Sequence, residues 1–161
     1  MTKFSSILAF ATVASGALLL TAPAIAEPTT FTIASSASGL NIQTNGRNFS
    51  GTISGTAGGS QDSVGCGWMS SKPNHTFSVD ADSIVSMKIR VSNPNGSTNV
   101  PYTLMIKNAS DPGASSFCAI AAPGIPAEIG GVWNKEGNYQ IFVGNFDSST
   151  ARDPYVLDIS N

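Results

Sequence analysis

Residues 84–92, which read Ile-Val-Ser-Met-Lys-Ile-Arg-Val-Ser, are the stretch that decides the fold class. Apolar and polar side chains alternate along it, and successive residues of a strand point to opposite faces. The apolar face consists of Val85, Met87, Ile89 and Val91. The pattern predicts an antiparallel strand with one face in the core and the other in water. The turn residues Asn93-Pro94-Asn95-Gly96 end it, because proline cannot donate to a ladder and Asn-Gly readily adopts positive φ.

The same alternation recurs along the chain. It predicts further strands at residues 102–107, 138–146 and 154–160, and weaker patterns mark 49–53, 76–79 and 116–120. No window after residue 26 has a convincing helical period. Short strands separated by Gly, Pro and Asn turns are typical of all-β folds. We therefore expect an antiparallel β-sandwich or jelly-roll-like domain of about eight strands.

The first 26 residues have the three parts of an export signal. Lys3 supplies a basic start, residues 7–20 are apolar, and Ala24-Ile25-Ala26 form a small-residue cleavage site that leaves Glu27 as the new N-terminus. The apolar run is interrupted and short compared with the roughly 20 residues that cross a bilayer. We expect a secreted protein, extracellular or periplasmic, with no membrane span after cleavage.

Residues 27–47 are expected to form an extended N-terminal arm, and residues 48–161 the sandwich domain. In the arm, Phe31 and Ile33 alternate with threonines, which indicates either an edge strand or a flexible leader. The glycine-rich residues 51–60 lack the lysine of a phosphate-binding loop, and no helical pattern follows them. They are interpreted as a loop or an irregular edge.

The charge of the chain is low and scattered. After residue 26 it carries all ten acidic and seven of the eight basic residues, a net charge of −3. Charged residues are 11% of the chain, against roughly a quarter in an average soluble domain. With no basic cluster, the sequence argues against a nucleic-acid partner.

The chain has two cysteines, Cys66 and Cys118, and both follow the signal. In an oxidising compartment such a pair is expected to form a disulfide. The cross-link would restrict the unfolded chain by about 4 kcal/mol in the loop-entropy model. Zinc binding by two thiolates without nearby histidines is disfavoured.

Three segments carry a resemblance to a known family: residues 77–81 (Phe-Ser-Val-Asp-Ala), residues 137–145 (Gly-Asn-Tyr-Gln-Ile-Phe-Val-Gly-Asn) and residues 154–160 (Pro-Tyr-Val-Leu-Asp-Ile-Ser). Together they resemble the opening, central and closing strands of the bacterial pre-peptidase C-terminal domain. That family consists of secreted β-sandwich modules often attached to exported proteases and other extracellular enzymes. The resemblance implies a bacterial binding or accessory domain standing alone.

Asp80 and Asp82 are the candidate metal ligands, because two carboxylates two residues apart can face one cation where the backbone turns. Calcium favours oxygen-rich loops, but it needs six or more oxygens, so a solvated turn is the alternative. The family often has an Asp-rich stretch in its middle strands, where residues 118–123 here are apolar. That departure puts an inherited calcium site in doubt, and we expect no other cofactor.

No catalytic residue is predicted. His75 is the sole histidine of the chain and precedes an expected strand, which favours a turn or packing role. There is no Gly-x-Ser-x-Gly elbow, metal cluster or cofactor loop. The sequence therefore argues against an enzyme.

Trp68 and Trp133 are the candidate ligand contacts, since both lie in glycine-bordered segments and sugars stack on exposed indole faces. A tryptophan beside a disulfide more often packs in a sandwich core, so core packing is the alternative.

The function expected from the sequence is a non-enzymatic module that binds an extracellular polysaccharide, matrix protein or envelope component. The alternative is a structural subunit of an extracellular assembly, in which residues 27–47 add a strand to a neighbour's sheet.

Overall fold

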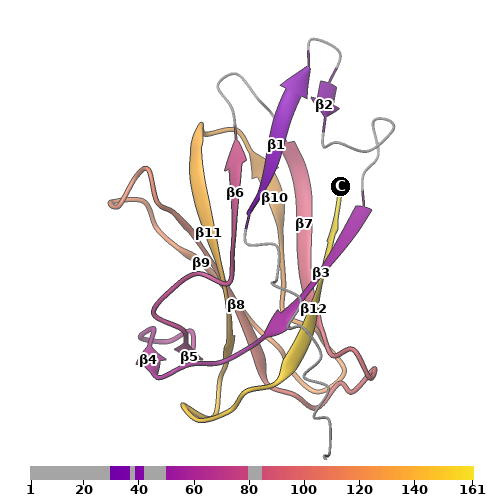
Figure 1. Ribbon diagram of the computed structural model, residues 1–161, viewed down its shortest axis with the longest axis vertical. Coiled ribbons are helices and arrows are strands. Elements are labelled where there is room, and N and C mark those ends of the chain that lie inside the picture. Colours follow the sequence, from indigo (N-terminus) through magenta and orange to yellow (C-terminus); the bar gives the residue numbers. More distant parts are fainter. Residues whose placement is uncertain (1–29, 37–38, 42–49, 80–84) are drawn as a thin grey trace, which may run out of the picture.

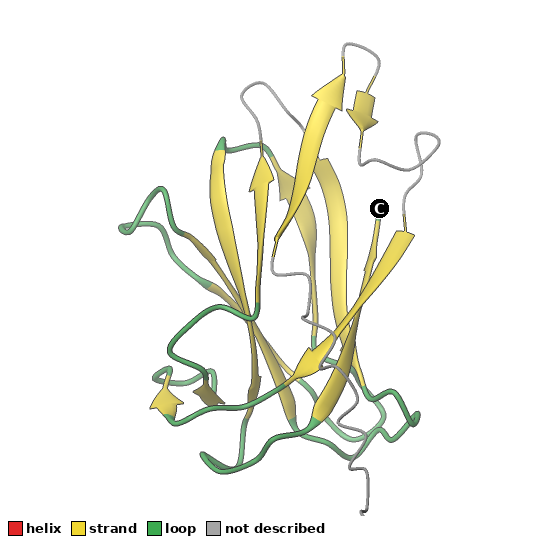
Figure 2. Ribbon diagram, viewed as in Figure 1, coloured by secondary structure: helices red, strands yellow, loops and turns green. Residues whose placement is uncertain are grey.

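The computed structural model describes residues 30–36, 39–41, 50–79 and 85–161, and the expected export signal lies outside these ranges. Strands and loops make up the described residues, which include no helix (Figure 2). Two β-sheets form the domain (Figure 1). None of the described segments is a helix long and apolar enough to cross a membrane.

The larger sheet is built around β11 (Gly137–Asn145), which pairs with β8 (Tyr102–Asn108) along one edge and with β6 (His75–Val79) and β5 (Trp68–Met69) along the other. The remaining strands of this sheet are β1 (Thr30–Ser36), β2 (Gly39–Asn41), β4 (Gln61–Asp62) and β9 (Phe117–Ile120). Of these, β9 pairs with β8, and β1 pairs with β6.

The smaller sheet has four strands in the order β10, β7, β12, β3. Their bounds are Glu128–Trp133 for β10, Val85–Ser92 for β7, Pro154–Ser160 for β12 and Ser50–Thr56 for β3. All three pairings in this sheet are antiparallel. The sheet therefore has β10 at one edge and β3 at the other.

The predicted β-sandwich with one disulfide is confirmed. Ten strands follow residue 48, and two of them, β4 and β5, have two residues each, so the expected number of about eight is close. The sequence does not predict β10, because the adjacent glycines Gly130-Gly131 have a low strand preference. Its backbone is nevertheless paired with β7 over six residues, and this pairing outweighs the low strand preference of glycine.

Side chains from both sheets form one core, as the alternation in residues 84–92 predicts. On β7, Met87, Ile89 and Val91 are buried, while the intervening Ser86, Lys88 and Arg90 are exposed. The larger sheet contributes Phe77, Val79, Leu104, Ile106, Tyr139, Ile141 and Val143 to the same cluster. Two-sided burial against a facing sheet is what holds a sandwich together.

The N-terminal arm forms an edge strand, one of the two alternatives that the sequence left open. β1 runs parallel to β6, with Phe31 opposite Phe77 and Ile33 opposite Val79. Among the strands of the described ranges this is the one parallel pair, and the other pairings are antiparallel. β1 thus extends the sheet of its own molecule, and addition to a neighbouring molecule stays a prediction.

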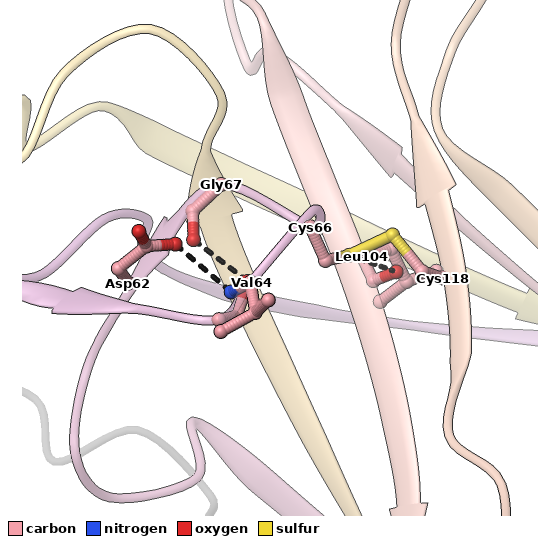
Figure 3. The surroundings of a disulfide bond; sticks show 7 residues. Asp62, Val64, Cys66, Gly67, Leu104 and Cys118 are labelled. Carbon is pink, nitrogen blue, oxygen red and sulfur yellow. Dashed lines mark hydrogen bonds between the residues drawn. A yellow bond between two sulfur atoms is a disulfide. The ribbon is translucent and has the colours of Figure 1, made fainter.

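A covering segment, residues 57–69, lies over the outer face of the larger sheet, where it is held by the disulfide between Cys66 and Cys118 (Figure 3). Beneath it a second apolar cluster contains Cys66, Met69, Met105 and Phe142. The segment comes very close to the sheet at Gly67, where a Cβ atom would lie 2.7 Å from the carbonyl oxygen of Asn145. This cover explains why both faces of β8 are buried over most of its length, although its sequence alternates.

Candidate functional site

Trp133, a predicted ligand contact, is part of the core. It ends β10 with 5% of its surface exposed, and its indole N–H donates to the carbonyl oxygen of Met87 at 3.4 Å. Its ring packs edge-on against Phe77 and Tyr139, with centroids 5.4 and 5.3 Å away. These contacts match the packing alternative better than an exposed stacking platform.

Trp68 lies elsewhere. It begins β5 in the covering segment, where it is half-buried and pairs with Asn145 at one end of β11. Trp133 packs against Tyr139, near the other end of that strand. The two tryptophans therefore do not form one site.

The remaining candidate residues are Asp80, Asp82 and His75. Asp80 and Asp82 lie outside the described residues, so the calcium prediction stays a prediction. His75 is fully buried, and its Nε2 lies 2.6 Å from the hydroxyl oxygen of Tyr155. This is a core polar pair between the two sheets, as the packing interpretation of His75 expects.

The site that the structure offers instead is a hollow at the seam where β9 of one sheet lies beside β10 of the other. The residues that line this seam hollow are Asn108, Ala114, Ser115, Phe117, Val132, Trp133, Asn134, Lys135 and Tyr139. It lies between the β8–β9 connection and the β10–β11 turn, and its volume is about 330 Å³. Trp133 contributes to its wall.

Phe117 is an exposed aromatic residue that packs directly against the core. Its partner in the ladder is the buried Ile106, and its ring packs against Trp133 with centroids 5.4 Å apart. Because β9 is the last strand of its sheet, nothing in the described chain covers the outer side of the ring, and 53% of Phe117 is exposed. Val132, on β10, is 64% exposed. Both residues line the hollow and are called its apolar rim here. Phe117 packs against the buried Trp133, whereas Val132, which precedes Trp133 in β10, points to the outer face of that strand.

Polar groups border this rim. Asn108, Ser115 and Asn134 bring amide and hydroxyl groups to the hollow, and Lys135 brings an ammonium group that lies 3.3 Å from a carboxylate oxygen of Asp111. That ion pair is exposed, so water screens it and Lys135 is held loosely.

Tyr139 is a second wall residue that a hydrogen bond holds in place. Its hydroxyl donates to the carbonyl oxygen of Lys135 at 3.0 Å, which closes the β10–β11 turn. Burial raises the pKa of this hydroxyl above its ordinary value, although the nearby ammonium of Lys135 and a hydrogen bond with Asn108 act in the opposite direction. Tyr139 therefore stays neutral and gives the hollow a rigid wall.

Phe117 is not among the site residues predicted from the sequence. Its local signal was an aromatic residue in a serine-rich segment, Ser115-Ser116-Phe117, next to a cysteine expected to be cross-linked. The weak strand pattern at residues 116–120 is visible from the sequence, but the edge position of that strand and the contact with Trp133 of the other sheet come from the tertiary structure.

The described surface has two further hollows, one beside the seam hollow and one by the β7–β8 connection. One of about 500 Å³ lies across the β8–β9 connection and shares Asn108 and Ala114 with the seam hollow. Another of about 200 Å³ lies between residues 93–98 and residues 121–126, with Asp158 and Arg90 at its side. In the described residues no three His, Cys, Asp or Glu side chains gather where they could hold a metal ion.

No family model matches the chain, and no curated protein matches it. Among solved structures, the chain is similar to the pre-peptidase C-terminal domain of a collagenase from Bacillus anthracis. The two share 18% sequence identity over 82% of this chain and 95% of that one, with a TM-score of 0.45. The solved domain is of the type that the three sequence segments resemble.

Proposed function

We propose that this chain is an exported, non-enzymatic binding module that recognises an extracellular polysaccharide through the seam hollow. The observation that carries the proposal is Phe117, an exposed aromatic ring that lies at the hollow against the buried Trp133; the exposed Val132 also lines the hollow. Large apolar side chains left open to water at a concave site commonly mark a place of recognition.

The chemistry of the rim favours sugars over the other candidates. A pyranose presents apolar C–H faces, which pack on a ring such as that of Phe117, and hydroxyls around its edge. The amide of Asn134 and the hydroxyl of Ser115 are donors and acceptors suited to those hydroxyls, whereas the amide of Asn108 already bonds to the Ser110 N–H and to Tyr139. A matrix protein or an envelope component remains the rival class of ligand and is an outcome of the test below.

The binding site of such a module is preformed, so a ligand can bind without a rearrangement of the wall. Trp133 and Tyr139 are each held by a hydrogen bond and by ring packing, so the wall of the hollow needs no ordering when a ligand arrives. Less conformational entropy is then lost on binding. The wall residues bring no carboxylate, imidazole or thiol to the hollow.

The test compares Phe117→Ala with Phe146→Ala in retention on insoluble cell-wall polysaccharide and on a glycan array. Phe146 is the matched control, because it is also an exposed phenylalanine (44% against 53%) and follows the far end of β11. We expect Phe117→Ala to weaken binding by about tenfold or more, or about 1.4 kcal/mol, and Phe146→Ala to leave it unchanged.

Val132→Ser serves as a second rim variant, since its side chain is exposed and its loss should leave the domain folded. Equal binding by the wild type and both rim variants would refute the seam hollow as the site. Retention by collagen or another matrix protein, with no retention by any polysaccharide, would refute the sugar assignment.

A further inference from the structure

The outer edge of β3 is the feature that the proposed function leaves unused. β3 is the last strand of the smaller sheet, and one of its edges pairs with β12 along all seven residues (Figure 1). Within the described ranges, no strand pairs with its other edge. An edge strand of this kind presents unpaired N–H and C=O groups to its surroundings.

The register shows which backbone groups face outward. The amide of Ala57, just after β3, donates to the carbonyl oxygen of Asp153, its direct counterpart in the pairing with β12. Bonded and non-bonded pairs alternate along an antiparallel ladder. The backbone groups that bond to β12 therefore belong to Gly51, Ile53 and Gly55, and those that point outward belong to Ser50, Thr52, Ser54 and Thr56.

An independent contact supports this assignment at one position. The side-chain amide of Asn74, which is not part of the smaller sheet, donates to the carbonyl oxygen of Thr56 at 3.1 Å. That carbonyl consequently faces away from β12 and already has a donor. The open part of the edge consists of the backbone groups of Ser50, Thr52 and Ser54.

β3 also lacks the features that usually protect an edge. Its sequence, Ser-Gly-Thr-Ile-Ser-Gly-Thr, contains no charge and no proline. The other edge of the same sheet, β10, carries Glu128, which is paired with Lys88 and Arg90. In the larger sheet β2, β4 and β9 have only three, two and four residues. Of these terminal strands, β3 is thus the long, uncharged one.

We propose that the edge of β3 pairs with β3 of a second copy of this chain, antiparallel and about a two-fold axis. A two-fold interface needs a surface that is complementary to itself, and an uncharged strand meets its own copy without electrostatic repulsion. The pairing joins the two four-stranded sheets into one continuous sheet.

The carbonyl of Thr56 selects the register. With Thr52 opposite Thr52 of the second copy, Ser50 lies opposite Ser54 and the three outward residues of each strand are all used. A shift toward Thr56 would compete with the hydrogen bond from Asn74. In the chosen register the Ser and Thr hydroxyls of both copies form one row of cross-strand pairs.

The same register also fits the residues on the other, core-facing side of β3. Ile53 then lies opposite Gly51 of the second copy. Ile53 is half-buried against the core, and the space where Gly51 would carry a Cβ atom is open for 4 Å around. The exposed part of Ile53 thus gains a neighbour that has no side chain to clash with it.

A charge swap at Thr52 tests both the pairing and its register. Thr52 lies on the exposed outer face, directly opposite Asp158 of β12. Thr52→Lys and Thr52→Glu should therefore both fold, with Thr52→Glu unfolding at a somewhat lower temperature than Thr52→Lys, because its carboxylate faces that of Asp158. In this register each variant places two like charges opposite each other. Sedimentation of the purified full chain, disulfide intact, should show wild-type dimers and, for either variant alone, association weakened by about tenfold or more.

An equimolar mixture of the two variants should recover the dimer, because Lys then faces Glu. Thr52→Val, which keeps the backbone N–H and the shape, is the matched control and should dimerise. The amides of Thr52 and Ser54 should also exchange hydrogen more slowly as the protein concentration rises. A wild type that stays monomeric at millimolar concentration, or a Thr52→Lys variant that dimerises like the wild type, would overturn the proposal.

Discussion

At the scale of the residue, Tyr102 shows how a single side chain joins distant parts of the chain. It is almost fully buried, its hydroxyl donates to the carbonyl oxygen of Pro154, and it accepts a hydrogen bond of 3.0 Å from the amide of Asn93. Burial raises the pKa of Tyr102, and the negative charge of Asp153 acts in the same direction, against the hydrogen bond from Asn93. The neutral phenol therefore fastens the β7–β8 turn to the start of β12.

This raised pKa predicts a loss of stability in alkali. The pKa of Tyr102 and Tyr139 lies above the ordinary value of 10.0 in the folded chain, so the folded state holds these protons more tightly than the unfolded state. Their contribution is complete below pH 10.0 and is lost as the pH rises through the raised values. Denaturant unfolding at a series of pH values should show this fall.

The control for this prediction is Tyr102→Phe, which removes one of the two phenols. It should lower the free energy of unfolding at neutral pH by about 1 kcal/mol, through the lost hydrogen bonds, and make the alkaline fall shallower. If the free energy of unfolding falls as steeply with rising pH in Tyr102→Phe as in the wild type, Tyr102 is not a cause of that fall.

At the scale of the element, the disulfide decides how the covering segment is held. The segment contributes Cys66 and Met69 to the outer cluster, and its backbone comes close to β11 at Gly67. Cys66 is bonded to Cys118 of β9, 52 residues further along the chain. The bond thus joins the covering segment to the strand that carries Phe117.

Removal of the disulfide between Cys66 and Cys118 should lower the free energy of unfolding. We expect the double variant Cys66→Ala/Cys118→Ala to lose about 4 kcal/mol in the free energy of unfolding, because the unfolded chain regains the entropy of a loop of this length. Urea unfolding of the variant and of the wild type measures the difference. Wild type treated with a reductant is the control and should approach the variant; a difference below about 1 kcal/mol would contradict the entropy argument.

At the scale of the whole molecule, the two proposed surfaces lie at opposite edges of the smaller sheet. The seam hollow adjoins β10, and the pairing edge is β3, with β7 and β12 between them. A dimer formed through β3 therefore leaves both hollows open and places them at its two ends. This arrangement would make the dimer bivalent for a long polymer.

Bivalency predicts that Thr52→Lys affects insoluble and soluble ligands differently. A monomeric variant should be retained on insoluble polysaccharide about 100-fold less well than the dimer, because avidity is lost, while its affinity for a short soluble oligosaccharide is unchanged. Pull-down and calorimetry on the same preparations measure the two quantities. An equal loss for both ligands would place Thr52 in the sugar site instead.

The sequence by itself determined the strands with clear alternation, because a period of two is a local property of the backbone. The bounds predicted for residues 84–92, 102–107, 138–146 and 154–160 differ from those of β7, β8, β11 and β12 by one residue at most. It also determined which cysteines form the disulfide, since a chain with two cysteines has one intramolecular pairing available.

Only the tertiary structure decided what lies at the surface. Trp133 is buried because three aromatic rings from other strands surround it, and Phe117 is exposed because β9 is the last strand of its sheet. β10 exists because β7 supplies hydrogen bonds to a backbone that its glycines alone would not extend. These outcomes depend on which residues meet across the sandwich, and local alternation carries no information about such long-range pairings.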